Sequence, residues 1–248
     1  MKAPASWVLS LPAPAAPRLK LFCFSHAGGG ASAFARWAQK VPRDVHVLPV
    51  QLPGRENRFS EPAPRSVPAL VLAAAANLPF GDEPFVFFGH SMGAAVAFEV
   101  ARALRREGRP LPRMLIASAS APPQGGYAHV TLHLAAGEEL VRQLRMYGAP
   151  EAVVTNQEML DLFTPVIQGD SRLVGEYQYA PEPPLPFPIT VYRAEQDSTV
   201  TQPLEPWGEL TTARFSIRSF PGNHMYLHPG DPAFYAALAE DLEAAVPR

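Results

Sequence analysis

The chain has 248 residues and a formal net charge of −2, so it offers no basic surface that could hold nucleic acid through its phosphates. A chain of this length can bury a sizeable core, and one domain is the simplest expectation. The single cysteine, Cys23, excludes a disulfide within the chain and favours a reducing compartment. No stretch approaches the roughly 20 apolar residues of a membrane span, so we expect a cytoplasmic protein without a membrane partner.

Apolar runs alternate with helical patterns along most of the chain. The runs expected to form strands cover residues 19–24, 46–51, 84–90, 113–120, 189–194 and 214–220. The early helical patterns cover residues 32–40, 66–78 and 91–108. Continuous apolar strands separated by helices are typical of a parallel sheet covered on both faces. The sequence therefore predicts an α/β fold, with residues 1–248 in a single domain.

The interval from about residue 121 to residue 188 interrupts this alternation. More than sixty residues separate two predicted strands here, and the proline-rich segment 181–188 is expected to be extended. Five apolar residues of the interval fall largely on one helical face: Leu160, Phe163, Ile167, Val174 and Tyr177. We predict a helical cap inserted over the sheet that shapes a substrate channel, with a purely structural appendage as the alternative.

The segment FFGHSMGAA (87–95) places a serine between two glycines, where a predicted strand gives way to a predicted helix. Gly89, Ser91 and Gly93 match the G-x-S-x-G pattern, in which a sharp turn exposes the serine hydroxyl. Such a turn leaves no room for side chains on either side of the serine, which explains the two glycines. The pattern predicts Ser91 as a nucleophile, and an ordinary turn residue is the alternative.

A serine hydroxyl is a poor nucleophile at neutral pH and needs a base within hydrogen-bond reach. In hydrolases with this turn, the chain order is serine, acid, histidine. Of the seven histidines, only His224 and His228 lie beyond the late predicted strands. His224 comes directly after the last strand, at the expected carboxyl edge of the sheet, and is the predicted base.

The acid that orients this base should follow an earlier strand at the same edge of the sheet. Glu195 and Asp197 both follow the strand 189–194, and Asp197, which lies deeper in the loop and has the shorter side chain, is the predicted acid. A turn aspartate that caps the next segment is the alternative role for Asp197. Asp170, in the predicted cap, and Asp231, at the start of the last helix, are weaker candidates.

Acyl chemistry also needs hydrogen-bond donors aimed at the oxyanion. The backbone N–H of Met92, directly after the serine, is one predicted donor. The second should come from the loop after an early strand, and FSHAGGGAS (24–32) has the form of the HGGG-type motif. We predict the N–H of Ala27 for this role, with Gly28 and Gly29 allowing the backbone to approach closely.

The glycine loop also satisfies a dinucleotide-binding pattern. Gly28, Gly30 and Ala33 match G-x-G-x-x-A after a strand and before a helical pattern. However, the next predicted strand ends in Gln51, without the carboxylate that would bind a ribose. We therefore predict no cofactor.

Two histidine pairs have the i,i+4 spacing that can bind a metal from one helix face. They are His129 with His133, and His224 with His228. Neither pair has the adjacent glutamate of H-E-x-x-H, and no cysteine or acid cluster completes either set. We therefore predict no metal site.

Five blocks of the sequence together form a specific signature: FCFSHAGGGASAFARW, QLPGRENRFSEP, FGHSMGA, EPWGELT and FPGNHMYL. With these blocks the chain resembles, over nearly its whole length, the type II thioesterases of the α/β-hydrolase fold, which accompany polyketide and nonribosomal peptide synthases. The resemblance implies a triad of Ser91, Asp197 and His224. It also implies oxyanion donors at Ala27 and Met92.

The resemblance implies a substrate class that the residues alone do not indicate. Such enzymes hydrolyse acyl thioesters on the phosphopantetheine arm of acyl or peptidyl carrier proteins, clearing aberrant or stalled acyl groups through an acyl-enzyme intermediate. A phosphopantetheinylated carrier protein is therefore the implied partner. Carrier proteins are usually acidic, so Arg142, Arg145 and Arg172, near the predicted cap, would face either a carrier or simply solvent.

Some positions differ from the family's usual form. Ser25 and His26 stand where many members have proline and tyrosine, and QGD at 168–170 stands where arginine-alanine-aspartate is common. The family-like block LPGRE contains Arg55 and Glu56, to which the sequence assigns no chemistry. A packed turn with a structural ion pair and a contact with substrate or carrier are equal alternatives for these two residues.

Other functions remain open on the same residues. A product-releasing thioesterase, a general carboxylesterase and an acyltransferase of this fold would all use the same nucleophile, base and acid. A hydrolase-like binding module without catalytic activity would use none of them. Labelling of Ser91 by a fluorophosphonate separates this last alternative from the enzymes.

Overall fold

The computed structural model describes residues 6–228 and 231–247, and a six-stranded sheet forms its centre. The strand order is β2-β1-β3-β4-β5-β6, and each neighbouring pair is parallel. The strands are β1 (Leu19–Phe24), β2 (Val45–Pro49), β3 (Phe85–His90), β4 (Leu115–Ser118), β5 (Ile189–Ala194) and β6 (Phe215–Phe220). All six predicted strands are present, and the predicted α/β class is confirmed.

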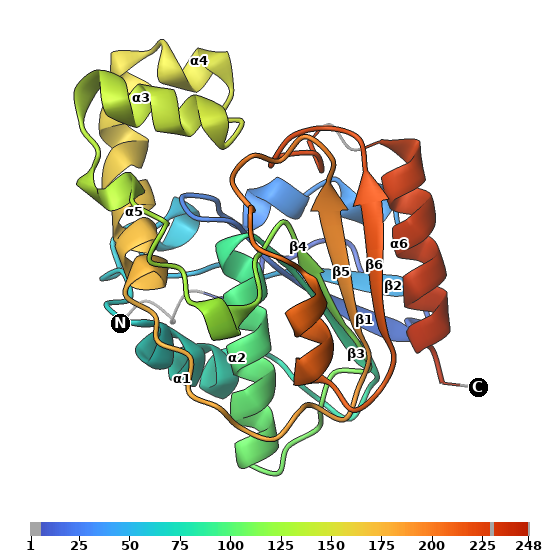
Figure 1. The fold of residues 1–248 in the computed structure, drawn as a ribbon. Coiled ribbons are helices and arrows are strands. Elements are labelled where there is room, and N and C mark those ends of the chain that lie inside the picture. Colours follow the sequence, from blue (N-terminus) through green and yellow to red (C-terminus); the bar gives the residue numbers. More distant parts are fainter. Residues whose placement is uncertain (1–5, 229–230, 248) are drawn as a thin grey trace.

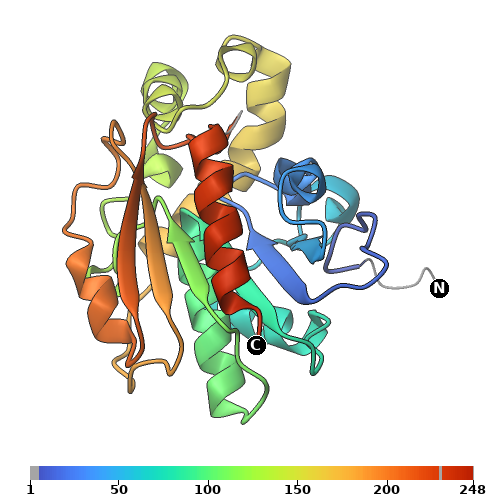
Figure 2. The same cartoon turned by 90° about the vertical axis from the view of Figure 1, so that its right-hand side faces the viewer.

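Helices cover both faces of the sheet (Figure 1). On one face α1 (Val67–Asn77) packs beside α2 (Met92–Arg106). Figure 2 shows α6 (Pro232–Ala245) in front of the opposite face. This arrangement buries both sides of every central strand, which explains why the strands read as continuous apolar runs.

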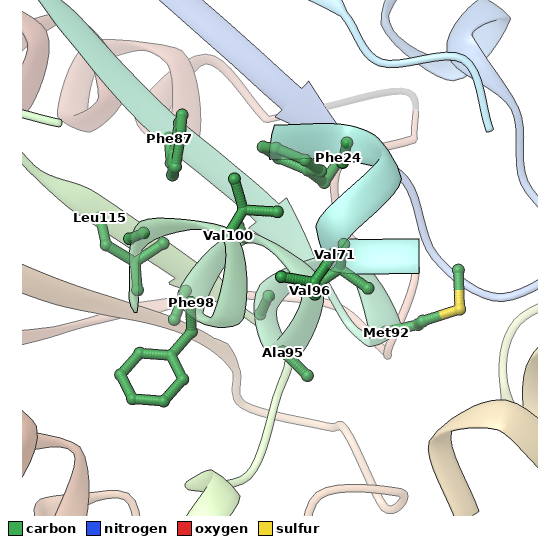
Figure 3. Packing of buried hydrophobic residues seen from close by; sticks show 14 of the residues in the cluster. Phe24, Val71, Phe87, Met92, Ala95, Val96, Phe98, Val100 and Leu115 are labelled. Atoms are coloured by element: carbon green, nitrogen blue, oxygen red, sulfur yellow. The ribbon is translucent and has the colours of Figure 1, made fainter. Parts of the chain in front are cut away.

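Two clusters of buried side chains lie on the two faces of the sheet. Because successive residues of a strand point to opposite faces, Phe22 and Phe24 of β1 join the cluster under α1 and α2, whereas Leu21 and Cys23 join the cluster under α6. Figure 3 shows part of the first cluster, including Phe24, Val71, Phe87, Val96, Val100 and Leu115. The packed sheet is thus a rigid base for the loops at its carboxyl edge.

The helix predicted at 32–40 is wrong in type. The segment forms two short 3₁₀ turns, Ala31–Phe34 and Trp37–Gln39. Phe34 and Trp37 are both buried, and their ring centroids lie 4.9 Å apart. Phe34 ends the first turn and Trp37 begins the second, so the interruption between the turns lies between two buried rings.

Residues 119–188, between β4 and β5, contain the helices α3 (Gly137–Met146), α4 (Glu151–Val154) and α5 (Gln157–Gly175). In Figure 1, α3 and α4 stand beyond the end of the sheet to which the β5 and β6 arrows point. A small separate cluster of buried residues packs them together: Leu132, Ala135, Leu140, Leu144 and Val154. This segment therefore has a core of its own above the carboxyl edge.

The helix α5 connects the small cluster to the main core. Leu160 and Ile167 pack against the small cluster, whereas Leu173 and Val174 belong to the cluster under α1 and α2. Pro165 lies inside the helix, between the exposed first half and the buried second half. Tyr177, expected on the same face, lies beyond the end of α5.

The chain returns to the sheet over the surface of α2. Glu182 forms ion pairs with Arg102, Arg105 and Arg106 of this helix, with N–O distances of 2.9, 2.6 and 2.7 Å. The hydroxyl of Tyr177 donates a hydrogen bond to Glu99 at 2.6 Å. These contacts hold the predicted extended segment 181–188, which contains no helix, against the core. Within 6–228 and 231–247, no helix has both the length and the apolar character needed to cross a membrane.

Candidate active site

Ser91 lies at the junction of β3 and α2, in a backbone conformation that few side chains adopt. Its φ is 55° and its ψ is −119°. A Cβ at Gly89 would lie 2.3 Å from the Gly93 carbonyl oxygen, and one at Gly93 would lie 2.1 Å from the Phe24 carbonyl oxygen. Both contacts are with backbone, so the strand-to-helix turn requires glycine at both positions.

The three residues predicted as a triad come together at the carboxyl edge of the sheet. The Ser91 Oγ lies 2.9 Å from the His224 Nε2, and the His224 Nδ1 lies 2.7 Å from the Asp197 Oδ2. They follow β3, β6 and β5 respectively, and the side chains of Asp197 and His224 are each 3% exposed. Because the carboxylate accepts the Nδ1–H, the Nε2 is left free to accept the serine proton.

Thr199 is a further member of this hydrogen-bonded group that the sequence analysis did not identify. Its N–H and hydroxyl donate to the Asp197 Oδ1 at 2.8 and 2.6 Å, and its Oγ1 lies 2.8 Å from the His224 Nδ1. Asp197 therefore also makes the turn contact that was its alternative role. Burial alone would raise the pKa of the Asp197 carboxyl, but the hydrogen bonds and charge of His224 and the bonds from Thr199 outweigh burial, so the pKa is lowered.

The other sequence candidates for acid and base have different partners. The Asp231 side chain caps α6 by accepting the Ala233 N–H at 2.6 Å. Glu195 is exposed at the end of β5. His228 packs near the His26 ring, with centroids 6.5 Å apart, and makes no hydrogen bond to the other candidates within the described ranges.

The predicted oxyanion donors lie beside Ser91. Ala27 and Met92 both line the cavity that contains Ser91 and His224. In the part of the chain that the structure describes, neither backbone N–H has a hydrogen-bond partner. Two donors without partners next to a nucleophile match what a tetrahedral oxyanion requires.

Two further histidines lie near the triad without joining it. His90 is fully buried, and its Nδ1 is hydrogen-bonded to the Ser118 Oγ at 2.8 Å. Burial, and then the nearby imidazoles of His224 and His26, hold the pKa of His90 well below its usual 6.5. Burial, followed by His228 and His224, also lowers the pKa of His26, to about 3. Both rings are therefore neutral near pH 7, and neither adds a positive charge beside the base.

A cavity of about 230 Å³ extends from Ser91 into the segment that contains α3 to α5. Its apolar lining includes Leu132, Leu144, Val153, Phe163, Ile167 and Val174. The Tyr147 ring, at the end of α3, meets the His224 ring edge to face at 5.1 Å. No sequence signal identified Tyr147, because a contact across 77 positions leaves no local pattern. A second cavity of about 770 Å³ shares His26, Gly28 and Phe163 with the first.

The histidines of the 129/133 pair, considered as metal ligands, have hydrogen-bond partners within the protein. His133 is hydrogen-bonded to Ser171 at 3.1 Å, and His129 to Gln202 at 3.0 Å. Across the described residues, no group of three or more histidine, cysteine, aspartate or glutamate side chains could hold a metal ion.

A family model for the thioesterase domain matches residues 19–245. The chain belongs to the thioesterase family. It is therefore a thioester hydrolase, and the resemblance drawn from the sequence blocks is confirmed.

Individual proteins are also similar to this chain over most of its length. The gramicidin S biosynthesis protein GrsT of Aneurinibacillus migulanus is 38% identical over 225 residues, which are 90% of this chain and 88% of that protein. The structure of the RedJ thioesterase, from the prodiginine biosynthetic pathway of Streptomyces coelicolor, matches with a TM-score of 0.86 and 35% identity, covering 97% of this chain and 92% of that one. The type II thioesterase BorB, from the borrelidin biosynthetic cluster, matches with a TM-score of 0.82 and 33% identity, covering 97% of this chain and all of that one.

The thioesterase block LPGRE contains a buried arginine whose partner lies in the segment above the sheet. The Arg55 guanidinium is paired with Asp170 of α5 through two hydrogen bonds, of 2.6 and 2.8 Å. Of the two alternatives for Arg55, the structure thus favours the packed ion pair. Glu56 accepts the Ser32 hydroxyl at 2.5 Å.

The arginines proposed to face a carrier protein differ in their surroundings. Arg142 is paired with Glu139 and Arg145 with Glu151, and these side chains are mostly exposed. Exposed pairs of this kind contribute little to stability, so they do not by themselves mark a binding surface. Arg172 is also exposed.

Proposed function

We propose that this thioesterase acts as a stand-alone type II enzyme, which removes aberrant or stalled acyl groups from the phosphopantetheine arm of carrier proteins in polyketide or nonribosomal peptide biosynthesis. The observation that carries the proposal is the hydrogen-bonded chain from Ser91 through His224 to Asp197 beside two unpartnered N–H groups, in a member of the thioesterase family. The relatives from antibiotic biosynthesis support the substrate class. We place this reaction in the cytoplasm.

The first half of the proposed reaction transfers the acyl group to the enzyme. The Ser91 Oγ attacks the thioester carbonyl carbon while the His224 Nε2 takes the hydroxyl proton. Asp197 holds the imidazole and stabilises its positive charge. The carbonyl oxygen becomes an oxyanion that accepts hydrogen bonds from the backbone N–H groups of Ala27 and Met92. When the carbon–sulfur bond breaks, His224 returns the proton to the leaving thiol, and the acyl-enzyme remains.

The second half consumes water. The His224 Nε2 removes a proton from a water molecule, whose oxygen attacks the ester carbonyl of the acyl-enzyme. The same two N–H groups stabilise the second oxyanion. Collapse of this intermediate breaks the bond to the Ser91 Oγ, which regains the proton from His224, and the free acid leaves. The lowered pKa values of His26 and His90 make both rings weak bases, and His224 is the imidazole hydrogen-bonded to the serine.

We propose that residues 121–188 form the cap that selects the acyl group. The apolar lining of the smaller cavity favours a hydrocarbon chain over a charged one. The larger cavity meets it at His26, Gly28 and Phe163, and we assign the phosphopantetheine arm to this larger space. Its lining includes the exposed Arg36, for which the described residues supply no ion-pair partner.

The test compares propionyl groups loaded on a phosphopantetheinyl carrier protein with propionyl-coenzyme A, for the native enzyme and Ser91→Ala. Faster release from the carrier, abolished in the variant, would support the editing role and the carrier as partner. Equal or absent activity on the carrier, together with rapid cleavage of simple esters, would reject the assigned partner. Dominant transfer of the acyl group to an added amine would instead identify an acyltransferase.

A further inference from the structure

The carboxylate of Asp170 joins helix α5 to the loop that carries one predicted oxyanion donor. Its Oδ2 accepts the Gly28 N–H at 2.7 Å, although 142 positions separate the two residues. The same oxygen accepts a hydrogen bond from Arg55 at 2.6 Å, and the Oδ1 accepts a second at 2.8 Å. Arg55 also donates to the Gly29 carbonyl at 3.1 Å. Asp170 and Arg55 thus hold the loop through one N–H and one carbonyl, in addition to the bond within the loop from the Gly29 N–H to the His26 carbonyl.

The bonded N–H belongs to the peptide unit directly after Ala27. The rigid peptide units that carry the Ala27 N–H and the Gly28 N–H meet at the Ala27 Cα, so only the φ and ψ of Ala27 set the direction of one N–H relative to the other. Gly28 has a φ of 78°, a conformation that glycine adopts readily and that needs no local side chain to hold it. The external bond from Asp170 therefore restricts a part of the loop that is intrinsically permissive.

A second contact from α5 reaches the same glycine. A Cβ at Gly28 would lie 2.4 Å from the Ile167 Cγ1, so the apolar side chain occupies the space that a side chain on the loop would need. Ile167 precedes Asp170 by one helical turn, and these two residues share one side of α5. Gly28 and Ile167 both line the Ser91 cavity. One helix of the cap therefore forms both the wall of the cavity and the support of the loop.

Burial indicates that the pair has a role other than net stability. The side chains of Arg55 and Asp170 are 4% and 5% exposed. A buried ion pair often contributes no net stability compared with apolar residues of similar size, but it can specify one conformation. The conformation specified here is that of the loop from His26 to Gly29.

From this geometry we propose that Asp170, held by Arg55, is a positioning residue, which fixes the oxyanion loop from the cap and directs the Ala27 N–H toward the reacting carbonyl. The proposal rests on the proposed function, because it takes Ala27 as an oxyanion donor. It adds that the oxyanion site is complete only while the second half of α5 lies against the loop.

The principal variant is Asp170→Asn, which keeps the size of the side chain but replaces one acceptor by a donor. We expect kcat/KM for propionyl-coenzyme A to fall about 10- to 100-fold, less than the 10²- to 10³-fold typical of losing an oxyanion donor outright. The affinity for a trifluoromethyl ketone analogue, which adds to the Ser91 Oγ and forms an oxyanion, should fall by the same factor. The affinity for a thioether analogue, which forms none, should change less than about threefold.

Two further variants separate positioning from folding. The matched control is Glu99→Gln, which removes one charge from another buried pair, with Arg102, away from the loop. It should leave both analogue affinities and kcat/KM within about threefold of the native values. The double variant Arg55→Met, Asp170→Leu replaces the pair by apolar side chains, so it should recover native melting behaviour while its kcat/KM stays low.

Three results would overturn the proposal. They are native kcat/KM in Asp170→Asn, equal loss of affinity for both analogues, and recovery of activity together with stability in the double variant. Failure of the proposed function would appear separately, as equal or absent release of propionyl groups from the carrier protein, or as hydrolysis of propionyl-coenzyme A that Ser91→Ala does not reduce.

Discussion

The His26 imidazole should make the folded protein less stable as the pH falls, and replacement of the ring by phenylalanine should remove this effect. Its Nδ1 is buried and has no hydrogen-bond partner among the described residues. Burial, with the nearby His228 and His224, lowers its pKa from 6.5 to about 3 in the folded state. In the unfolded chain the ring titrates at its usual value. Between these two values the unfolded state binds a proton that the folded state does not, so stability decreases on acidification.

The size of the effect follows from the two pKa values. Protonation of the ring lowers the free energy of the unfolded chain by 2.303RT times the logarithm of 1 + 10^(6.5−pH). This term is about 2 kcal/mol at pH 5 and close to zero at pH 8. The residue His26 is half-buried, and contact with solvent reduces the penalty, so we expect about 1–2 kcal/mol. For a chain of this length, each kcal/mol corresponds to a shift in Tm of about 2–4 °C.

The assay is urea unfolding of the native protein and His26→Phe at several pH values from 5 to 8. Packing changes in the variant shift both ends of the series alike, so the quantity to compare is the change in unfolding free energy between pH 8 and pH 5. That change should be about 1–2 kcal/mol smaller in the variant. A slope of the same sign should remain, because His90 is buried with a lowered pKa in both proteins.

The control is His46→Phe, on an edge strand, where the ring is only partly buried. This exchange should alter the pH dependence far less than the exchange at His26. Parallel stability curves for the native protein and His26→Phe would refute the reasoning, because they would mean that His26 is as easily protonated in the folded protein as in the unfolded chain.

Three further changes test other parts of the structure. Asp197→Asn should lower kcat by about 10⁴-fold, because the amide no longer fixes the imidazole tautomer. A loss below about tenfold would remove Asp197 from the acid role. Gly93→Ala should prevent stable folding, since its Cβ would lie 2.1 Å from a backbone oxygen. Gly169→Ala has open space around the new Cβ, so it should leave Tm unchanged or raise it slightly. Equal Tm values for the two variants would contradict this geometry. Glu182→Ala leaves three arginines of α2 without their shared partner and should lower the unfolding free energy by about 1–3 kcal/mol in urea titrations, and no change would mean that these pairs are dispensable.

Local patterns were enough to predict the strands and the turn at Ser91, because a buried parallel strand and a G-x-S-x-G turn are both encoded by consecutive residues. His224 and Asp197 were predicted from one further rule, that the carboxyl ends of parallel strands share an edge. The structure brings all three side chains together. Their catalytic roles stay predictions until the variants are measured.

Contacts between distant segments left no such pattern. The partner of Arg55 lies 115 positions away, in a helix whose sequence gives no sign that its aspartate faces a glycine loop. The segment 32–40 has apolar residues at spacings that suit an α-helix, but it forms two separate 3₁₀ turns in which Phe34 and Trp37 pack on Phe88 of β3. Tertiary packing decided both outcomes, and packing is not visible in composition or periodicity.

Helix α5 joins the main core to the small cluster of α3 and α4, and these two parts should differ in their stability against local unfolding. We expect amide hydrogens of the sheet to exchange with solvent only when the large clusters on both faces come apart, whereas protection of α3 and α4 rests on a cluster of five buried residues. Pro165 supplies no N–H to α5, so the helix has one internal hydrogen bond fewer in the part that packs against the small cluster. We therefore expect the outer helices to open and reclose as a unit while Leu173 and Val174 stay packed in the main core, so that the entrance to the cavity changes without unfolding of the sheet.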